Sequence, residues 1–352
     1  MAKKSVFNVA VFGAGAIGLD HLGSFKQHPA VKLAAIADTS VERARDAAEM
    51  YNVPVVTSNY REIIARDDID VISIALPNYL HATVALDALR AGKHVMIDKP
   101  MATNARDAAK LVAEAKKRRV LLMVGQNNRF SPDVQTLKQL VTKGVLGEVY
   151  HAKTAWTRRS GIPRIGSWFT QSKFAGGGST YDIGVHALDR CLYLMGEFDA
   201  AAVSGQTYAK FGPRGQGEGA WGKSEIDPKK PFDVEDMSVA LIKLKSGRTV
   251  LLETSWAGHQ AVADFNGTQL FGTEAGALMP NLQLFRKTEH GYAVESISTT
   301  TDLVNPNRMA HFIDCLLGKE EPYVKPAESL AVQKILDAIY ASARTGREVR
   351  IR

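Results

Sequence analysis

The segment VFNVAVFGAGAIG, residues 6–18, decides the fold of this chain. It opens with an apolar run of strand length that leads directly into Gly13, Gly15 and Gly18. The residues that follow are typical of a helix, which His28-Pro29 ends. A strand, a glycine turn and a helix in this order are the setting in which the pattern G-x-G-x-x-G binds a dinucleotide.

Each glycine of this turn has its own physical reason. Gly13 permits the tight turn, Gly15 lets the backbone approach a pyrophosphate, and Gly18 lets the helix pack closely on the strand. The helix begins around Ala16 and Ile17, and its N-terminus faces the negative charge. We therefore expect the turn to bind the phosphates of a nicotinamide dinucleotide.

An acidic residue ends the second expected strand, residues 32–38. Asp38 lies twenty residues after Gly18, where a carboxylate accepts hydrogen bonds from the adenosine ribose. A 2′-phosphate there would place like charges together, so NAD is expected in preference to NADP. Arg43, one helical turn later, could reach such a phosphate, although arginines on a helix surface usually point to solvent. The alternative is an ordinary glycine turn beside a solvated aspartate.

The composition indicates a globular chain of two domains. Its 352 residues exceed what one core usually serves, and 45% are hydrophobic and 23% charged. The net charge of +7 is spread along the chain without a basic run interleaved with aromatic residues, so a nucleic acid partner is not expected. No apolar run approaches the ~20 residues of a membrane span. Cys191 and Cys315 lie in apolar helical patterns that suit buried thiols, and we expect a cytoplasmic protein.

Strands and helices alternate through the first third of the chain. This order predicts a doubly wound parallel sheet in a Rossmann domain of residues 1–126, with ligands at the carboxyl ends of its strands. Pro77 and Asn78 follow the strand of residues 71–75. Asp98 and Lys99 end the next strand, so all four lie at such ends.

A different pattern follows, and it predicts an α+β domain of residues 127–352 for substrate binding and oligomerisation, with a large, mostly antiparallel open sheet. Its C-terminal helix can pack back on the Rossmann domain. The strands of residues 237–244 and 249–256 are joined by Lys245-Ser246-Gly247-Arg248, a hairpin signal. One open sheet face implies a homodimer or homotetramer. Residues 204–231 lack apolar periodicity, and an ordered arm near the site is slightly favoured over a lid or a disordered loop.

Several motifs together resemble the glucose-fructose oxidoreductase, inositol dehydrogenase and MocA family over nearly the whole chain. They are the glycine loop, Leu76-Pro77-Asn78-x-x-His81, Asp98-Lys99-Pro100, Gly176-Gly177-Gly178, Asp182-x-x-x-His186 and Pro326-Ala327-Glu328-Ser329. The usual lysine motif of that family is Glu-Lys-Pro, so Asp98 is one methylene shorter than the family's acid.

The resemblance implies NAD(P)-dependent oxidation of a secondary alcohol on a sugar or cyclitol. It places cofactor contacts at the carboxyl ends of the strands and just after the last of them, at Leu76, Pro77, Asn78, His81, Asp98, Lys99 and Gln126. His81 is expected to orient the Pro77-Asn78 turn.

The residues themselves suggest the chemistry. Alcohol oxidation needs a base for the hydroxyl proton and a cation for the developing alkoxide. His186 can serve as the base and Lys99 as the cation. Asp182, four residues before His186 on one face of an expected helix, can orient the imidazole or bind a substrate hydroxyl. No third ligand joins this pair, so a metal site is not expected.

Three further residues are weaker candidates for substrate contacts. Arg129 is expected either to contact the cofactor or the substrate, or to form a surface salt bridge. Arg159 either reaches a phosphate or carboxylate of a substrate or is solvated. Trp168 either borders the site or packs in the core.

Two other functional classes stay open. One is a glycosidase that oxidises, eliminates, adds water and reduces without net use of cofactor, and the other is a non-catalytic NAD(P)-binding regulator.

Overall fold

The computed structural model describes residues 5–219, 227, 229–299 and 307–351. The chain forms two compact units, of which unit 1 comprises residues 1–125 and 307–330 and unit 2 comprises residues 126–306 and 331–352. The expected boundary after residue 126 lies beside the division observed after Gly125. Residues 307–330, expected in the second domain, belong to unit 1.

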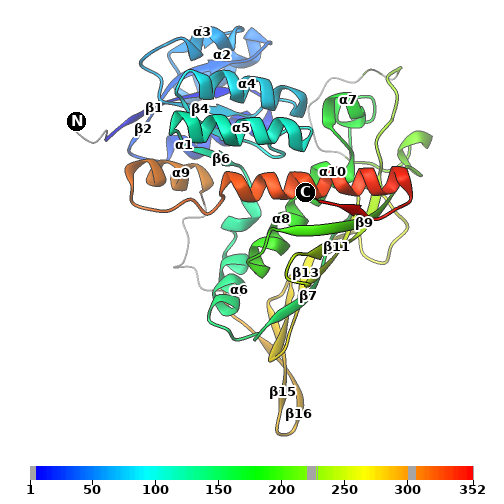
Figure 1. Ribbon diagram of the computed structural model, residues 1–352. Helices are drawn as coiled ribbons and strands as arrows, with labels where there is room; N and C mark the ends of the chain where they lie inside the picture. Colours follow the sequence, from blue (N-terminus) through cyan, green and yellow to red (C-terminus); the bar gives the residue numbers. More distant parts are fainter. Residues whose placement is uncertain (1–4, 220–226, 228, 300–306, 352) are drawn as a thin grey trace. The chain divides into compact units, whose positions relative to one another are not determined.

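Unit 1 alternates strands and helices. Its elements are β1 (Phe7–Phe12), α1 (Ala16–Lys26), β2 (Val31–Ala37), α2 (Val41–Tyr51), β3 (Val55–Thr57), α3 (Tyr60–Ile64), β4 (Val71–Ile74), α4 (Asn78–Arg90), β5 (His94–Ile97), α5 (Ala105–Arg118), β6 (Leu122–Val124) and α9 (Arg308–Leu317) (Figure 1). The helices begin at caps that the sequence supplies. The side chains of Ser40, Asn59 and Asn104 accept backbone N–H groups of α2, α3 and α5.

The six strands of unit 1 form one parallel sheet in the order β3-β2-β1-β4-β5-β6. The order reverses between β1 and β4, which places a crevice at the carboxyl ends of these two strands. Strands β1, β4 and β5 are almost entirely buried, as strands covered on both faces must be. The expected Rossmann sheet is confirmed.

The returning segment completes unit 1 on the side of α1. Asn307 caps α9 through the N–H groups of Met309 and Ala310, and its amide donates to the carbonyl of Ser24. Arg308 forms an ion pair with Asp20 of α1 at 2.7 Å. The α9 helix therefore packs on α1 although nearly 300 residues separate them in sequence.

Unit 2 is built around a nine-stranded sheet. Its elements are α6 (Pro132–Thr142), β7 (Val149–Arg158), β8 (Ile162–Pro163), α7 (Ser172–Ala175), α8 (Val185–Met195), β9 (Ala200–Tyr208), β10 (Glu218–Gly219), β11 (Met237–Leu244), β12 (Thr249–Ser255), β13 (Asp264–Gly272), β14 (Ala275–Met279), β15 (Gln283–Thr288), β16 (Gly291–Ser296) and β17 (Val349–Arg350). Helix α10 (Pro326–Thr345) starts in unit 1 and continues in unit 2 from Ala331.

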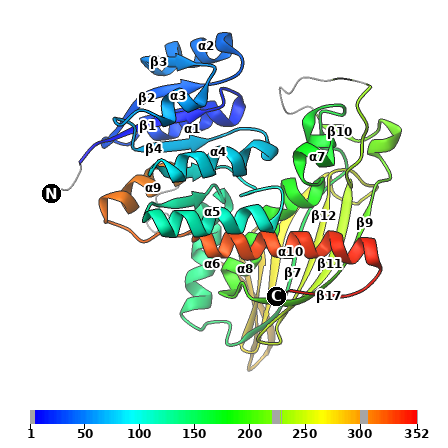
Figure 2. The same ribbon diagram turned by 45° about the horizontal axis from the view of Figure 1, so that its top comes forward.

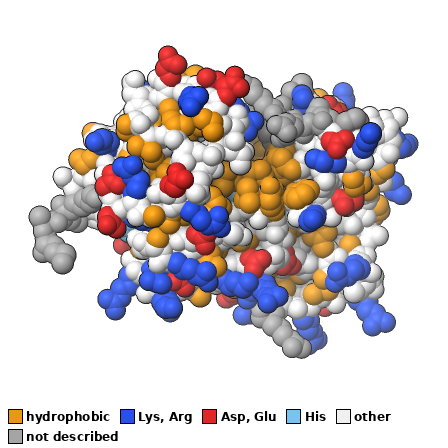
Figure 3. Space-filling model, turned by 90° about the horizontal axis from the view of Figure 1, so that it is seen from above, with side chains coloured by type: hydrophobic (Ala, Val, Ile, Leu, Met, Phe, Trp, Pro, Cys, Tyr) orange, Lys and Arg blue, Asp and Glu red, His pale blue; other side chains and the backbone are white. Residues whose placement is uncertain are grey.

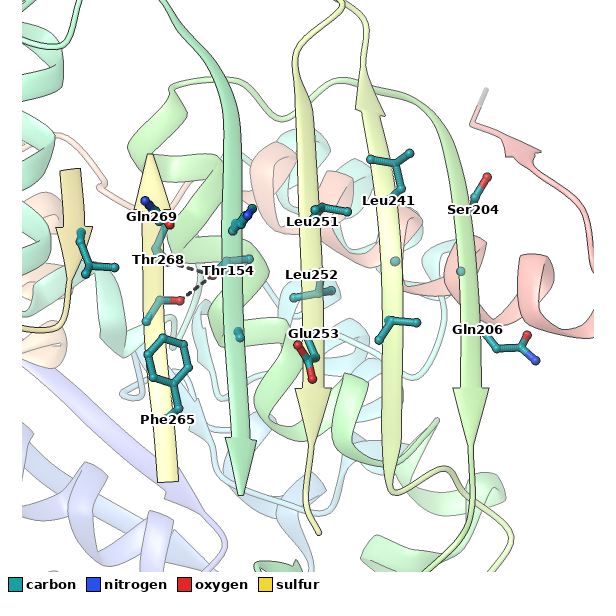
Figure 4. Close-up of a pocket in the computed structure, with 17 residues that line it drawn as sticks. Thr154, Ser204, Gln206, Leu241, Leu251, Leu252, Glu253, Phe265, Thr268 and Gln269 are labelled. Atoms are coloured by element: carbon teal, nitrogen blue, oxygen red, sulfur yellow. Dashed lines mark hydrogen bonds between the residues drawn. The ribbon is translucent and has the colours of Figure 1, made fainter. Parts of the chain in front are cut away.

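The strand order of this sheet is β16-β15-β14-β13-β7-β12-β11-β9-β17, and only the pair β7 and β12 is parallel. Helices α8 and α10 cover one face (Figure 2), where their apolar side chains share a core with inward residues such as Val250 and Leu252. The other face carries Leu241, Leu251 and Phe265 (Figure 4). The expected mostly antiparallel open sheet is confirmed.

The longest strands that the sequence patterns did not predict are β7 and β9. Strand β7 mixes polar and apolar residues on both faces, so its alternation is weak. Strand β9 extends through Tyr208 into the segment of residues 204–231, for which an ordered arm near the site is expected. That segment continues with a turn at Gly212–Arg214 and the short β10. Its residues 220–226 and 228 lie outside the described part of the chain.

Two surface properties bear on partners. Within the described residues, every helix is too short or too polar to cross a membrane. Basic and acidic side chains occur near one another across the face shown in Figure 3.

Candidate functional site

The glycine turn after β1 is closed by backbone contacts that leave no room for side chains. Gly13 has φ of +100°, and a Cβ atom there would lie 2.2 Å from the carbonyl oxygen of Ala75. A Cβ on Gly18 would lie 1.9 Å from the carbonyl oxygen of Gly13. Gly15, in contrast, has open space beside it, and Ala16 and Ile17 start α1 at the surface. The turn therefore presents the first N–H groups of α1 to a ligand.

Asp38 lies next to this turn and is held by three donors. Its Oδ2 accepts the N–H of Ala14 at 2.7 Å, while Oδ1 accepts the N–H of Ser40 at 2.8 Å and the Arg43 guanidinium at 2.9 Å. Burial raises the pKa of Asp38, but these three hydrogen bonds outweigh burial and hold the pKa below its usual value. Asp38 is therefore an ionised acceptor beside the glycine turn.

Arg43 does not simply point to solvent, as helix-surface arginines usually do. Its guanidinium is half-exposed and forms the ion pair with Asp38. The acid that is expected to select against a 2′-phosphate and the cation that could bind one are thus in direct contact. An open glycine turn, the N-terminus of an 11-residue helix and this carboxylate fit an adenosine dinucleotide.

The loops after β4 and β5 are tied together by His81. This buried imidazole has Nδ1 2.7 Å from the carbonyl oxygen of Pro100 and Nε2 2.7 Å from that of Leu76. A neutral ring has one N–H and donates to one of the two, whereas an imidazolium donates to both. Burial lowers the pKa of His81, and the two carbonyl oxygens oppose that effect. His81 therefore joins the two loops that carry the other candidate residues of unit 1.

Those candidates lie as expected at the carboxyl edge of the sheet. Pro77 and Asn78 start α4, and Asn78 is buried. Asp98 and Lys99 directly follow β5, both half-buried, and the Lys99-Pro100 peptide is cis. Gly125 keeps the neighbouring strand end open for Asp98, because a Cβ there would lie 3.0 Å from Asp98 Oδ1.

Asp182 and His186 lie on consecutive helices of different type. Asp182 belongs to a π-helical turn, Thr180–Gly184, and His186 to the first turn of α8. The prediction of one helix that begins near Thr180 is therefore wrong in its first turn, which is π-helical. Asp182 and His186 are both buried and follow one another along one helical axis. Asp182 Oδ2 accepts the indole N–H of Trp256 at 2.9 Å, and the His186 ring lies 5.7 Å from that of Trp156.

Trp256 is the residue of this site that sequence reasoning missed. It is fully buried and directly follows β12, in a small core with Ile162, Ile183 and Val234. Its indole N–H fixes the orientation of the Asp182 carboxylate. The only signal in the sequence was an aromatic residue with a hydrogen-bond donor at the end of an expected strand.

Glu235 is a second residue that the sequence did not single out. Its buried carboxylate accepts the N–H groups of Gly178 at 2.9 Å and Thr180 at 2.8 Å, and the hydroxyl of Tyr340 at 2.8 Å. Gly178 is required here, since a Cβ would lie 1.8 Å from the Glu235 carbonyl oxygen. This carboxylate therefore caps the start of the π-helical turn that carries Asp182.

The four remaining candidates have diverse surroundings. Gln126 is buried, and its side-chain oxygen has no hydrogen-bond partner within the described part of the chain. Arg129 was expected at a ligand or in a surface salt bridge, but its ion pair with Asp189 is fully buried. Exposed Arg159 donates to the carbonyls of Gln260 and Ala261. Trp168 stacks on Phe169 with ring centroids 3.8 Å apart.

No cluster of three or more His, Cys, Asp or Glu side chains suited to a metal ion occurs among the described residues. The described geometry thus consists of a dinucleotide turn with its acid in unit 1, and a helix with a fixed carboxylate and a histidine in unit 2.

Comparisons with known proteins agree with this geometry. The model of the GFO/IDH/MocA oxidoreductase family with an NAD-binding Rossmann fold matches residues 7–126, and that of the GFO/IDH/MocA C-terminal domain matches residues 134–278. D-glucoside 3-dehydrogenase of Escherichia coli K12 is 30% identical over 99% of this chain and 98% of its own. Levoglucosan dehydrogenase of Pseudarthrobacter phenanthrenivorans is 30% identical over 72% of this chain and 68% of its own.

A solved structure of levoglucosan dehydrogenase in complex with NADH and levoglucosan shares the fold, with a TM-score of 0.85 at 24% identity. It covers 98% of this chain and 99% of its own. The expected Rossmann fold, the expected enzyme class and the expected family are confirmed. The chain belongs to the GFO/IDH/MocA family of oxidoreductases with an NAD-binding Rossmann fold.

Proposed function

We propose that the protein is an NAD-dependent dehydrogenase that oxidises one secondary alcohol of a sugar, a sugar derivative or a cyclitol. D-glucosides are the first substrates to test, because the relative that matches the whole chain is named for them. The observation that carries the proposal is the Asp182 carboxylate, fixed by the Trp256 indole one helical turn before His186. A histidine so placed suits proton transfer from an alcohol.

The cofactor side of the proposal rests on unit 1. NAD, when bound, supplies an acceptor for the hydride that leaves the carbinol carbon. The proposed cofactor residues are those of the glycine turn, the strand ends and their neighbours, namely Gly13, Gly15, Ala16, Ile17, Asp38, Arg43, Leu76, Pro77, Asn78, His81, Asp98, Lys99 and Gln126. Asp38 would accept from the ribose hydroxyls in addition to its protein donors, since an ionised carboxylate accepts about four hydrogen bonds.

Three side chains would act on the substrate. His186 takes the hydroxyl proton, and the Lys99 ammonium stabilises the negative charge that develops on the alcohol oxygen. Asp182 orients the substrate or the imidazole, and the Trp256 N–H, which donates to its Oδ2, holds the carboxylate in place for that role. Trp168 remains a proposed contact of the sugar, and Arg159 a proposed contact only of a phosphate or carboxylate group that a substrate carries. The buried ion pair of Arg129 gives that residue a structural role instead.

The setting of the enzyme is also proposed. Cys191 and Cys315 are both free thiols, which supports a reducing, cytoplasmic location. The apolar open face of the nine-stranded sheet supports a homodimer or homotetramer.

A panel of sugars, glucosides and cyclitols tests the function. Each compound is incubated with the purified protein and NAD, and NADH is followed at 340 nm. Oxidation of at least one compound is expected, and a panel without NADH formation or product contradicts the proposal. Release of an aglycone without net NADH would indicate the glycosidase route, and NAD binding without any turnover would indicate a regulator.

Two variants test the residue roles with the best substrate of that panel. Lys99→Met should lose at least ~10² in kcat while NAD binding survives, because one electrostatic group has been removed. His186→Ala should lose most activity together with the limb of log(kcat/KM) that rises with pH in the histidine range. Near-normal turnover of Lys99→Met removes the lysine from the mechanism. An unchanged pH profile of His186→Ala assigns the base elsewhere.

A further inference from the structure

We propose that a pocket at one edge of the nine-stranded sheet binds a phosphoryl group of the substrate. The preferred substrate would then be a phosphorylated sugar, either a sugar phosphate or a nucleoside diphosphate sugar. This inference rests on the proposed function and deepens it by naming the substrate class.

The pocket has a volume of about 750 Å³ and is formed by three loops. These loops follow the carboxyl ends of β7, β9 and β12, which all run in the same direction in the sheet. The described lining residues are Arg159, Ser160, Phe211, Arg214, Gln216, Gly217, Gly258, His259 and Gln260. They include two arginines and a histidine but no acid.

Backbone hydrogen bonds join the three loops into one frame. The N–H of Gly161 donates to the carbonyl of Gly217 at 2.9 Å, and the N–H of Gly258 donates to that of Arg159 at 3.3 Å. The hydroxyl of Ser160 donates to the carbonyl of Glu218 at 2.8 Å. Each loop therefore constrains the position of the next, so these hydrogen bonds hold the shape of the pocket.

Backbone carbonyls and an aromatic ring hold both guanidinium groups in place, and neither group is paired with a carboxylate of the described residues. Arg159 donates through Nε to the carbonyl of Gln260 at 2.9 Å and through Nη2 to that of Ala261. Arg214 donates through Nε to the carbonyl of Lys210 and lies over the Phe211 ring, 5.3 Å from its centroid. The His259 ring meets the same phenyl ring edge-on. Each arginine thus keeps N–H donors for a ligand, since a guanidinium has five.

The nearby carboxylates are engaged elsewhere. Asp236 Oδ2 accepts the N–H groups of Lys210, Phe211 and Gly212, which shapes the turn before Arg214. Glu218 accepts the N–H of Ile165 at 2.9 Å. Two fixed cations with an adjacent imidazole suit a dianionic phosphoryl group better than a singly charged carboxylate.

The wall of the pocket is close in sequence to Trp256, which holds the carboxylate of the candidate site. Gly258, on its wall, is two residues after Trp256, whose indole N–H holds Asp182. Two residues span at most ~7 Å between Cα atoms. A Cβ on Gly217 would lie 2.4 Å from the Ala257 Cβ, so the intervening residue also touches the pocket wall. A sugar bound at Asp182 would therefore have its phosphoryl substituent within reach of the arginines.

The test compares methyl glucoside, glucose 1-phosphate and UDP-glucose as substrates for the wild type, Arg159→Gln and Arg214→Gln. The wild type should favour a phosphorylated substrate in kcat/KM. Each variant should raise KM for that substrate ~10-fold, equivalent to about 1.4 kcal/mol, and leave KM for methyl glucoside within twofold. Comparison of the two phosphorylated compounds distinguishes a sugar phosphate from a nucleotide sugar. Arg286→Gln, on distant β15, is the matched control and should change neither constant.

Calorimetric titration with glucose 1-phosphate separates this inference from the proposed function, because it needs no turnover. Binding to the wild type that weakens in both pocket variants supports the pocket even if no compound is oxidised. Oxidation of methyl glucoside with equal or better kcat/KM than the phosphorylated compounds overturns the pocket and leaves the dehydrogenase intact. Unchanged KM values for the phosphorylated compounds in both variants overturn the proposed phosphoryl pocket as well.

Discussion

At the scale of single residues, we expect the ion pair of Asp38 and Arg43 to set the choice of cofactor. A 2′-phosphate beside the Asp38 carboxylate would meet a like charge, and the half-exposed guanidinium is already bound to that carboxylate. We expect kcat/KM to favour NAD over NADP by at least ~10-fold, about 1.4 kcal/mol, which is a modest demand on one charge contact. Asp38→Ser should narrow this ratio mainly by improving NADP, because Arg43 is released to pair with the phosphate.

The double variant Asp38→Ser with Arg43→Gln is the control for that explanation. It should lose the gain in kcat/KM with NADP that the single variant shows. The kcat/KM with NAD should be equally low in both variants. For each variant, the ratio of kcat/KM with NAD to kcat/KM with NADP is obtained from initial rates with each nicotinamide at a fixed sugar concentration. A wild type that uses the two cofactors equally, or a double variant that keeps the gain, would show that other groups select the cofactor.

The residues of the candidate site differ in how well they could be predicted from the sequence. Gly13, Asp38 and Lys99 were predictable because each directly follows a strand of a parallel sheet, so the strand pattern alone locates it at the ligand edge. Trp256 and Glu235 were not, since their partners Asp182 and Gly178 lie 74 and 57 residues away in sequence. Contacts of that kind depend on the register of the nine-stranded sheet, which local periodicity does not determine.

At the scale of elements, the π-helical turn Thr180–Gly184 depends on Glu235. A π-helical turn is rare and is often found at functional sites, and here a buried carboxylate satisfies its first N–H groups. Glu235→Gln keeps the shape but removes one acceptor for these groups. With a neutral glucoside we expect kcat to fall ~10-fold while the dissociation constant of NAD stays unchanged, because Asp182 loses its exact position.

Asp236→Asn is the matched control for Glu235→Gln. It alters an equally buried neighbour that holds the turn at residues 210–212, and kcat with the neutral glucoside should stay within twofold. A similar loss of kcat in both variants would indicate general loosening of the fold instead of a specific effect on Asp182.

The difference in stability between the wild type and Glu235→Gln should depend on pH. Burial raises the pKa of Glu235 above its unfolded value near 4.3, although hydrogen bonds from Thr180 and Gly178 oppose this. The stability linked to its protonated form is complete below that value and is lost as pH rises through the folded pKa. The wild type should therefore lose part of its Tm advantage over Glu235→Gln as pH rises from about 4. A constant difference in Tm would show that Glu235 does not titrate in the folded protein.

At the scale of the whole molecule, the two kinds of sheet differed in how well they could be predicted. In unit 1 the alternation of elements and the parallel direction of the strands were predictable, because largely apolar strands alternate with capped helices. In unit 2 the hairpin of β11 and β12 was predictable from its turn, whereas β9 and its place beside β11 were not. The return of residues 307–330 to unit 1 has no local signature, since it depends on long-range contacts such as Arg308 with Asp20.

The open face of the nine-stranded sheet is the expected interface between copies of this chain. Leu251 is 41% exposed and Phe265 37%, and Leu251 lies directly opposite Leu241 on the neighbouring strand (Figure 4). Leaving such a patch in water costs roughly 25 cal/mol per Å² of apolar area that a second copy would cover. We therefore expect a dimer or tetramer by sedimentation velocity, and Leu251→Glu, which adds a charge beside Glu253, should dissociate it with little change in Tm. Met50 is an exposed apolar residue on α2, and Met50→Glu is the control. Its assembly should have the same mass as that of the wild type. An assembly unchanged by Leu251→Glu, or a monomeric wild type, would show that this face is not the interface.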